Sequence, residues 1–305
     1  MLDIKLIRQS PEEVKEGLKK RGFDVSAVDD VLALDAKRRE ILKELEEGRA
    51  ETNKKSKEKP SPEEIESLKK LKNKIKDLED ELAIAEKNLD EKMYQLPNLP
   101  LPDVPVGKDE KDNKVLYEVG DRPKFDFEPK KHYEIGESLD IIDTERSAKV
   151  SGSRFGYIKG QAALLEFALL NFALKKLVKK GFIPIIPPVL INEEAMRGMG
   201  YIDTEADREE RYWFEKDPEG DASRPYGAGK QYLVGTSEQS IGPMYSNEVF
   251  EEKVLPLRFV AFSSCFRREA GSYGKDVRGM MRVHQFDKLE MFSYTKPEDS
   301  VKEHK

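Results

Sequence analysis

The chain has 305 residues, a formal net charge of −6 and a single cysteine, Cys265. One cysteine excludes a disulfide framework, and three widely separated histidines give no zinc-ligand spacing. The start of the chain has no uninterrupted apolar run of the signal-peptide type, so we expect a cytoplasmic protein that does not cross a membrane. The total charge does not indicate a nucleic-acid binder, so any such role must come from local charge.

Residues 27–95 predict an antiparallel helical hairpin. Apolar residues recur at alternating steps of three and four in both halves of this segment, which is the spacing of a coiled-coil seam. Pro60 and Pro62 separate the halves, because proline is not tolerated in a helix interior. Pro62 is followed by two glutamates, a pattern typical of a helix start. The two halves should therefore fold back on each other.

The hairpin has two interpretations on pattern alone. It could be a solvated coil that serves oligomerisation, or an arm that contacts a large partner. Lysines gather near the predicted tip, as contacts with phosphate groups would require. Glu63, Glu64 and Glu66 dilute this positive charge, so the pattern favours neither interpretation strongly.

Composition divides the rest of the chain. Residues 96–129 are rich in Pro, Gly and Asp, which is typical of a linker. We expect an arm domain over residues 1–107, a linker over residues 108–132 and a globular domain over residues 133–305. Within the globular domain, residues 161–180 predict a long, mostly apolar helix that is buried in the core. Residues 204–230 are polar with scattered aromatics, which is typical of a surface insertion.

Residues 257–294 carry the pattern that is most informative about chemistry. A strand is predicted from Phe259 to Glu269, then a glycine-containing loop, then a second, antiparallel strand from Met280 to Tyr294. Side chains alternate between the faces of a strand, so one face of the second strand should carry Arg282, His284, Phe286, Lys288, Glu290 and Phe292. This face could simply meet water. Its guanidinium, ring and carboxylate would also suit an extended ligand with a phosphate, a flat ring and an ammonium group.

Several stretches resemble one family of enzymes. CFRREAGSYGKDVRGMMRVHQFDKLEMF strongly resembles motif 2 of the class II aminoacyl-tRNA synthetases, in the form found in seryl-tRNA synthetases. KKGFIPIIPPVL resembles motif 1, with Pro188 at its characteristic proline, and LVGTSEQS resembles the serine-binding loop. The predicted hairpin is similar to the tRNA-binding arm of that family. The resemblance covers essentially the whole chain.

The resemblance implies a fold and an activity. The implied fold is α+β, with an N-terminal antiparallel coiled-coil hairpin arm before a catalytic domain built on an antiparallel β-sheet. The implied activity is ATP-dependent activation of L-serine to seryl-adenylate, followed by transfer of serine to the 3′ end of tRNA(Ser), with tRNA(Sec) as a further acceptor where the host has one. Mg²⁺ is the implied metal, and a homodimer is the implied assembly, with motif 1 at its interface.

The same resemblance implies roles for individual residues. Arg267 and Glu290 are expected to be catalytic, Arg267 by holding the α-phosphate of ATP and Glu290 by binding the polar groups of serine. The expected serine-binding residues are Thr236, Ser237, Glu238 and Glu290. The expected ATP-binding residues are Arg267, Arg268, Glu269, Arg282, Val283 and Phe286, with Phe286 stacked on adenine. No residue is expected to ligate a metal. Two structural alternatives stay open: Glu238 could cap a helix, and Arg267 could pair with Glu269.

No stretch after Glu290 resembles motif 3, which in this family holds a second phosphate-binding arginine and a metal-binding glutamate. We therefore expect these 305 residues alone to have little or no activation activity. Two other functions are consistent with parts of the sequence. One is a synthetase-like ligase that loads a carrier protein, although the hairpin argues against it. The other is a non-catalytic tRNA-binding or scaffolding protein derived from the synthetase.

Overall fold

The computed structural model describes residues 2–55, 62–215, 230–270 and 279–305. The chain divides into two compact units, Met1–Arg122 and Pro123–Lys305. Each unit has buried apolar clusters of its own. The domain boundaries at residues 107 and 132 that composition suggests stay predictions.

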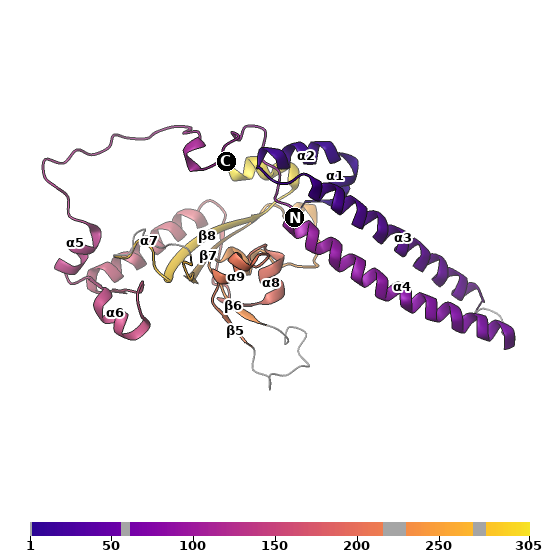
Figure 1. The fold of residues 1–305 in the computed structure, drawn as a ribbon. Helices are drawn as coiled ribbons and strands as arrows, with labels where there is room; N and C mark the ends of the chain where they lie inside the picture. The colour runs from indigo at the N-terminus through magenta and orange to yellow at the C-terminus, as the bar shows by residue number, and fades with distance from the viewer. Residues whose placement is uncertain (1, 56–61, 216–229, 271–278) are drawn as a thin grey trace. The chain divides into compact units, whose positions relative to one another are not determined.

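The first unit is built on the helical hairpin (Figure 1). Its long helices are α3 (Ser26–Lys55) and α4 (Pro62–Gln95), and two short helices, α1 (Ile4–Gln9) and α2 (Pro11–Lys20), precede them. A 3₁₀ turn, η1, spans Glu110–Asp112. The predicted hairpin and the start of its second helix at Pro62 are confirmed.

Apolar side chains fill the seam between α3 and α4. Ile41 and Leu45 of α3 are buried against Leu78 and Ala85 of α4. A second cluster lies where α1 and α2 meet the hairpin, and it consists of Ile7, Val14, Leu18, Val28, Val31, Leu89, Met93 and Leu96. Lys92 is at the surface and pairs with Asp30 at 3.3 Å, while its neighbour Met93 is buried, because a straight helix drifts away from a strict heptad repeat.

Leu45 is the best-buried member of the seam, with 1 % of its surface exposed. We expect Leu45→Ala to lower the free energy of unfolding of this unit by about 3 kcal/mol, because the truncation leaves a cavity that helices can close only in part. Urea unfolding followed by circular dichroism measures the change. Ile84→Ala is the matched control, since Ile84 of α4 is 61 % exposed and its truncation should cost less than about 0.5 kcal/mol. Equal losses in the two variants would contradict the packing of the seam.

A buried carboxylate ties α1 to α3. Asp35 receives hydrogen bonds from Arg8 at 2.7 and 2.8 Å and from Arg39 at 3.0 Å, and 1 % of its side chain is exposed. Burial alone would raise the pKa of Asp35. The hydrogen bonds and charges of Arg8 and Arg39 outweigh burial and hold that pKa below its ordinary value. The short first helix is therefore fixed to the hairpin by a charged contact as well as by packing.

The second unit contains three small sheets among its described residues. In the central sheet, β3 (Ile183–Ile185) runs parallel to β7 (Leu257–Phe266), which pairs antiparallel with β8 (Gln285–Tyr294). The second sheet is antiparallel and has the order β4 (Leu190–Asn192), β6 (Gln231–Leu233), β5 (Trp213–Phe214). The third is the pair β1 (Ile142–Asp143) and β2 (Tyr157–Ile158). The helices are α5 (His132–Ser138), α6 (Thr144–Ser151), α7 (Gly160–Val178), α8 (Glu193–Gly198), α9 (Glu205–Glu209), α10 (Glu238–Ile241) and α11 (Ser300–His304), with 3₁₀ turns η2 (Glu252–Val254) and η3 (Pro297–Asp299). The α+β architecture is confirmed.

The two predicted strands are shorter than expected. β7 ends at Phe266 rather than Glu269, and β8 begins at Gln285 rather than Met280. Glu269 has a φ of 52°, which extended backbone does not adopt. The amide of Arg268 bonds to the carbonyl of Glu210, outside the ladder. Arg267, Arg268 and Glu269, and likewise Arg282, Val283 and His284, therefore lie in segments that flank the ladder.

The stretch 204–230 is not simply a surface insertion. It contributes α9 and the strand β5, which pairs with β6 through Trp213 and Tyr232. Residues 216–229 of this stretch lie outside the described part of the chain. The strand was not predicted, because β5 is short, lies in a polar stretch and leaves its side chains largely exposed.

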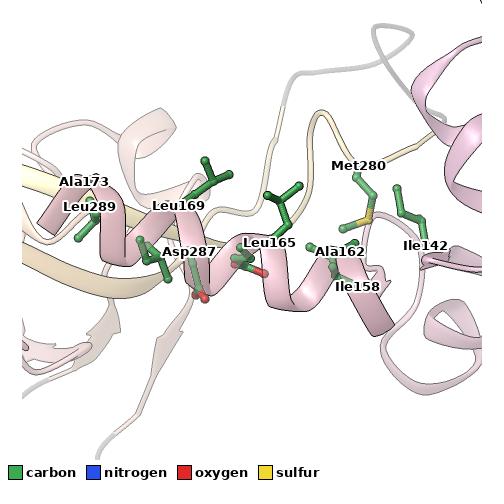
Figure 2. Close-up of a pocket in the computed structure, with 11 residues that line it drawn as sticks. Ile142, Ile158, Ala162, Leu165, Leu169, Ala173, Met280, Asp287 and Leu289 are labelled. Carbon is green, nitrogen blue, oxygen red and sulfur yellow. The ribbon is translucent and has the colours of Figure 1, made fainter. Parts of the chain in front are cut away.

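The long apolar helix α7 is confirmed, but the expectation that it is buried is wrong. One flank contacts β3 and β7, while Leu164, Phe167, Leu169 and Phe172 are exposed. The helix is mostly apolar, and among the described residues only one of its flanks packs against other elements. A groove of about 440 Å³ runs along it, and Figure 2 shows Leu165 and Leu169 beside this groove with Asp287 and Leu289 of β8. No helix in the described ranges combines the length and apolar character needed to span a membrane.

A charged pair fixes the last helix to the central sheet. Arg258 of β7 donates from Nε and Nη2 to the two carboxylate oxygens of Glu303 in α11, at 2.5 and 2.6 Å, and the Ser293 hydroxyl donates to the same carboxylate at 2.8 Å. The guanidinium of Arg258 lowers the pKa of Glu303 to about 2. A lowered pKa means that the pair stabilises α11 at pH values above the ordinary glutamate pKa of 4.5 and that this stabilisation is lost as the pH falls toward about 2.

We expect the Glu303 carboxyl to titrate near pH 2 in the wild type and close to its ordinary value of 4.5 in Arg258→Met, where the guanidinium is missing. The carboxyl ¹³C chemical shift, followed by NMR across the acid range, measures both values. Lys302→Met is the control, because Lys302 makes no hydrogen bond to Glu303 within the described residues and contributes only a smaller charge effect. The same titration in the wild type and in Arg258→Met would contradict the contact.

Candidate functional site

The candidate site lies on one face of the central sheet. The ladder places Ala261, Ser263 and Cys265 of β7 opposite Glu290, Lys288 and Phe286 of β8. The β7 residues are small and buried, so the larger β8 side chains stand above them. The segment 235–239, which follows β6, lies against this face through hydrogen bonds to both strands. The groove along α7 belongs to the opposite face, where the side chains of Asp287 and Leu289 point.

Three side chains form the centre of the site. The hydroxyl of Thr236 donates to Oε2 of Glu290 at 2.7 Å. Nζ of Lys288 donates to the Thr236 hydroxyl at 3.0 Å and also pairs with the Glu290 carboxylate. Thr236 is buried, whereas Lys288 and Glu290 are about a third and a fifth exposed, respectively. A polar cluster with acceptors and a compensating cation is therefore open to a small polar ligand.

The rest of the segment 235–239 holds this cluster in position through hydrogen bonds to β7 and within the loop. Ser237 is fully buried, and its hydroxyl shares a hydrogen bond of 2.7 Å with that of Ser263. The Gln239 side chain accepts a hydrogen bond from the amide of Gly235 at 2.8 Å, which closes the loop. Ser237 therefore holds the loop on β7, because its hydroxyl points into the sheet rather than toward the ligand face.

Glu238 contributes a second carboxylate. Its Oε2 accepts a hydrogen bond from the hydroxyl of Tyr201 at 3.1 Å. Burial, followed by the negative charge of Glu238, raises the pKa of Tyr201 to about 12, so the phenol stays a donor at neutral pH. Glu238 is the first residue of α10, and its described side-chain contact is with Tyr201 rather than with a helix end.

Arg267 connects the loop to the aromatic ring on β8. Its Nε donates to the carbonyl of Gly235 at 3.2 Å, and its guanidinium carbon lies 5.4 Å from the centre of the Phe286 ring. Glu269 does not pair with Arg267 but forms an ion pair with Arg282. The guanidinium of Arg267 is thus held between the loop and the ring, and no carboxylate of the described residues lies within ion-pair distance of it.

The other predicted ATP-binding residues are at the margin. Arg268 is exposed, and Val283 is 7 % exposed, so Val283 packs inside the unit rather than facing open space. Arg282 and Glu269 form their pair beside the interrupted end of the ladder. Thr236, Glu238, Glu290, Arg267 and Phe286 therefore gather around one site, while Ser237 supports it from beneath.

Four side chains at the site were not among the expected site residues: Tyr201, Arg211, His284 and Lys288. Nδ1 of His284 lies 2.9 Å from the carbonyl of Arg267, and its ring lies between Phe155 at 5.2 Å and Tyr212 at 6.2 Å. The alternation along the second predicted strand placed His284 and Lys288 on the face that carries Glu290, but no role was assigned to either residue. Tyr201 and Arg211 gave no signal, because they reach the site from a stretch that is distant in sequence.

The described residues contain no group of three or more His, Cys, Asp or Glu side chains that could hold a metal ion. Magnesium commonly binds through the phosphates of a nucleotide and keeps several waters, so a protein cage is not required for it.

Comparison with known proteins identifies relatives of both units. Residues 1–100 match the model of the seryl-tRNA synthetase N-terminal domain, and residues 212–305 match that of the tRNA synthetase class II core domain (G, H, P, S and T). The chain is 44 % identical over 315 residues to the serine–tRNA ligase of Corynebacterium kroppenstedtii and 45 % identical over 314 residues to serine–tRNA ligase 1 of Streptomyces avermitilis. In both cases the match covers 100 % of this chain and 70 % of the relative.

Two solved structures share the fold. One is seryl-tRNA synthetase from Pyrococcus horikoshii in complex with ATP, with a TM-score of 0.83 and 37 % identity, covering 100 % of this chain and 72 % of that one. The other is the cytoplasmic serine–tRNA ligase of Naegleria fowleri in complex with AMP, with a TM-score of 0.80 and 31 % identity, covering 100 % of this chain and 69 % of that one.

Proposed function

This chain belongs to the serine–tRNA ligase family, and on that premise we propose that it activates L-serine with ATP and transfers the seryl group to the 3′ end of a serine tRNA. The observation that carries the proposal is the cluster of Thr236, Lys288 and Glu290 beside the Arg267–Phe286 pair. The polar cluster of Thr236, Lys288 and Glu290 suits an amino acid with a polar side chain, and the Arg267–Phe286 pair suits a nucleotide.

Serine offers an ammonium group and a hydroxyl group, both of which donate hydrogen bonds. Glu290 and Glu238 supply carboxylate acceptors at the mouth of the loop, and Thr236 supplies a hydroxyl between Glu290 and Lys288. A site built to bond a substrate hydroxyl rejects the analogue that lacks it, because its own polar groups then stay unpaired. Selection of serine over alanine is proposed to rest on Thr236 and Glu290.

The nucleotide side of the site follows from charge and shape. An adenine ring can lie on the face of Phe286, and the Arg267 guanidinium can bond the α-phosphate in a bidentate manner. In the activation step a carboxylate oxygen of serine attacks the α-phosphorus, the bond to the β-phosphate oxygen breaks, and pyrophosphate leaves. The protein contributes position and positive charge rather than a covalent intermediate. Mg²⁺ is proposed to bind together with ATP, through the phosphates of the nucleotide.

The hairpin α3–α4 is proposed to bind the tRNA. The resemblance of this arm and the match of residues 1–100 support that role, and the lysines on α3 and α4 provide charge for phosphate contacts. Serine tRNA is the proposed acceptor, with selenocysteine tRNA as a second acceptor where the host has one. The cytoplasm is the proposed compartment, as the single cysteine suggests.

We also propose a homodimer that covers the exposed side of α7. Phe167 and Phe172 are 68 % and 67 % exposed there, and apolar surface of this kind usually meets a partner. Light scattering should give the mass of a dimer for the wild type and of a monomer for the double variant Phe167→Glu, Phe172→Glu. A dimer that survives both substitutions would place the interface elsewhere.

Binding of a non-hydrolysable seryl-adenylate analogue, measured by isothermal titration calorimetry, tests the proposed function without requiring turnover. The seryl analogue should bind at least roughly 100-fold more tightly than the alanyl analogue. Retention of serine tRNA without binding of either analogue would favour the non-catalytic alternative. The expectation that these 305 residues alone support little ATP–pyrophosphate exchange stays a prediction, which the same preparation tests.

A further inference from the structure

Two guanidinium groups meet at Gly235, and only one of them belongs to the predicted site. A methyl group added at Gly235 would lie 3.1 Å from Nη1 of Arg211 and 3.4 Å from Cγ of Arg267. Gly235 is buried, and Arg211 and Arg267 are both half-buried. The two arginine side chains therefore lie against the same small residue, and the charge of Arg267 acts on Arg211.

Each arginine is held by direct contacts with uncharged groups, and the charges of Glu210 and Asp207 also act on Arg211. The Arg211 guanidinium lies 5.0 Å from the centre of the Tyr201 ring, and its Nε donates to the Tyr201 carbonyl at 3.4 Å. Arg267 donates to the Gly235 carbonyl and lies over Phe286. Within residues 2–55, 62–215, 230–270 and 279–305, no carboxylate forms an ion pair with either arginine.

Two positively charged groups that lie close together in a half-buried site repel each other. Burial, followed by the positive charge of Arg267, lowers the pKa of Arg211. An arginine stays charged even so, and an anion seated between the two groups would remove the repulsion. The two arginines therefore form a preorganised anion-binding site.

We propose that Arg211 and Arg267 together bind the phosphate of the adenylate, with Arg211 as the second guanidinium on that group. This inference rests on the proposed function. The position of the two arginines supports a phosphate as their ligand. Arg267 adjoins Phe286 on the nucleotide side of the site. Arg211 adjoins Tyr201, whose hydroxyl bonds to Glu238 on the amino-acid side. In an aminoacyl-adenylate, the group between the base and the amino acid is the phosphate.

The test compares AMP with adenosine, which lacks the phosphate, in titration calorimetry of the whole chain. Arg211→Met should weaken AMP binding about tenfold or more, as expected for the loss of a charge-assisted bond, and should leave adenosine binding unchanged. Arg211→Lys should retain part of the AMP affinity. Arg208→Met is the matched control, because Arg208 is also half-buried and bonds to a backbone carbonyl, that of Ile202 at 3.2 Å, but does not approach Gly235.

Each outcome decides one question. If the wild type binds neither AMP nor adenosine, the proposed nucleotide site is wrong and the inference falls with it. If both bind but Arg211→Met loses nothing for AMP, or loses equally for AMP and adenosine, the role of Arg211 is wrong and the proposed function stands. If Arg208→Met loses as much AMP affinity as Arg211→Met, the effect is structural and the inference is again wrong.

A second measurement needs no substitution. Phenylglyoxal modifies accessible arginines, and mass spectrometry locates the modified residues. AMP should protect Arg211 and Arg267 of the wild type from modification, while adenosine should protect Arg211 much less. Modification of Arg211 at the same rate with and without saturating AMP would overturn the proposal.

Discussion

Glu290→Gln is expected to weaken binding of the seryl-adenylate analogue roughly 100-fold, or about 3 kcal/mol. The substitution keeps the size and one acceptor oxygen of the side chain, so the contact with Thr236 can persist. It removes the negative charge that compensates Lys288 and that would meet the ammonium or hydroxyl group of serine. The loss therefore measures charge rather than shape. Calorimetry with the seryl analogue provides the affinity for the wild type and the variant.

The control for this prediction is Glu248→Gln, which removes the same charge at an exposed position of the same unit. It should bind the analogue like the wild type. Adenosine provides an internal control, because the Glu290 variant should bind it normally. Wild-type affinity for the seryl analogue in Glu290→Gln would refute a role of this carboxylate in serine binding.

Asp35→Ala should lower the free energy of unfolding of the first unit by about 3 kcal/mol. The substitution removes a buried carboxylate and leaves the guanidinium groups of Arg8 and Arg39 facing each other without a counter-charge. The two arginines are partly exposed, so water relieves some of the cost, and the value lies at the lower end for a broken buried pair. Urea unfolding followed by circular dichroism measures it.

Asp30→Ala is the matched control, because Asp30 pairs with Lys92 at the surface and its loss should cost less than about 1 kcal/mol. The pH dependence provides a second check. The pKa of Asp35 is lowered in the folded unit, so its contribution is present above the ordinary aspartate value of 3.8 and is lost as the pH falls below that value. A stability difference between the wild type and Asp35→Ala that persisted unchanged in strong acid would contradict this account.

The sequence predicted the elements whose signals are local or periodic. The heptad spacing and Pro62 were sufficient for the hairpin, and alternation along residues 285–294 was sufficient for the face that carries Phe286, Lys288 and Glu290. The strand ends were wrong because they depend on backbone that pairs elsewhere: the Arg268 amide bonds to Glu210, and the His284 amide bonds to the carbonyl of Arg154. Such bonds join residues that no local pattern relates.

Burial and long-range approach were the other sources of error. Helix α7 was expected inside a core because it is apolar, but the described part of the chain covers only one flank of it. Arg211 was overlooked because it lies in a polar stretch that appeared peripheral, and only the fold brings it beside Gly235. Residue types predicted which side chains could bind a ligand. The fold of the chain decides which of these side chains come together in one site.

The small residues of β7 limit how the amino-acid pocket could be redesigned. Ala261, Ser263 and Cys265 already form its floor, and each is at most 3 % exposed. Trimming them further would yield almost no room for a bulkier amino acid, and Ser263 also anchors the loop through Ser237. To accept a larger, non-natural amino acid, the pocket should therefore be enlarged at its side, around Thr236 and Tyr201, while the residues of the floor are left unchanged.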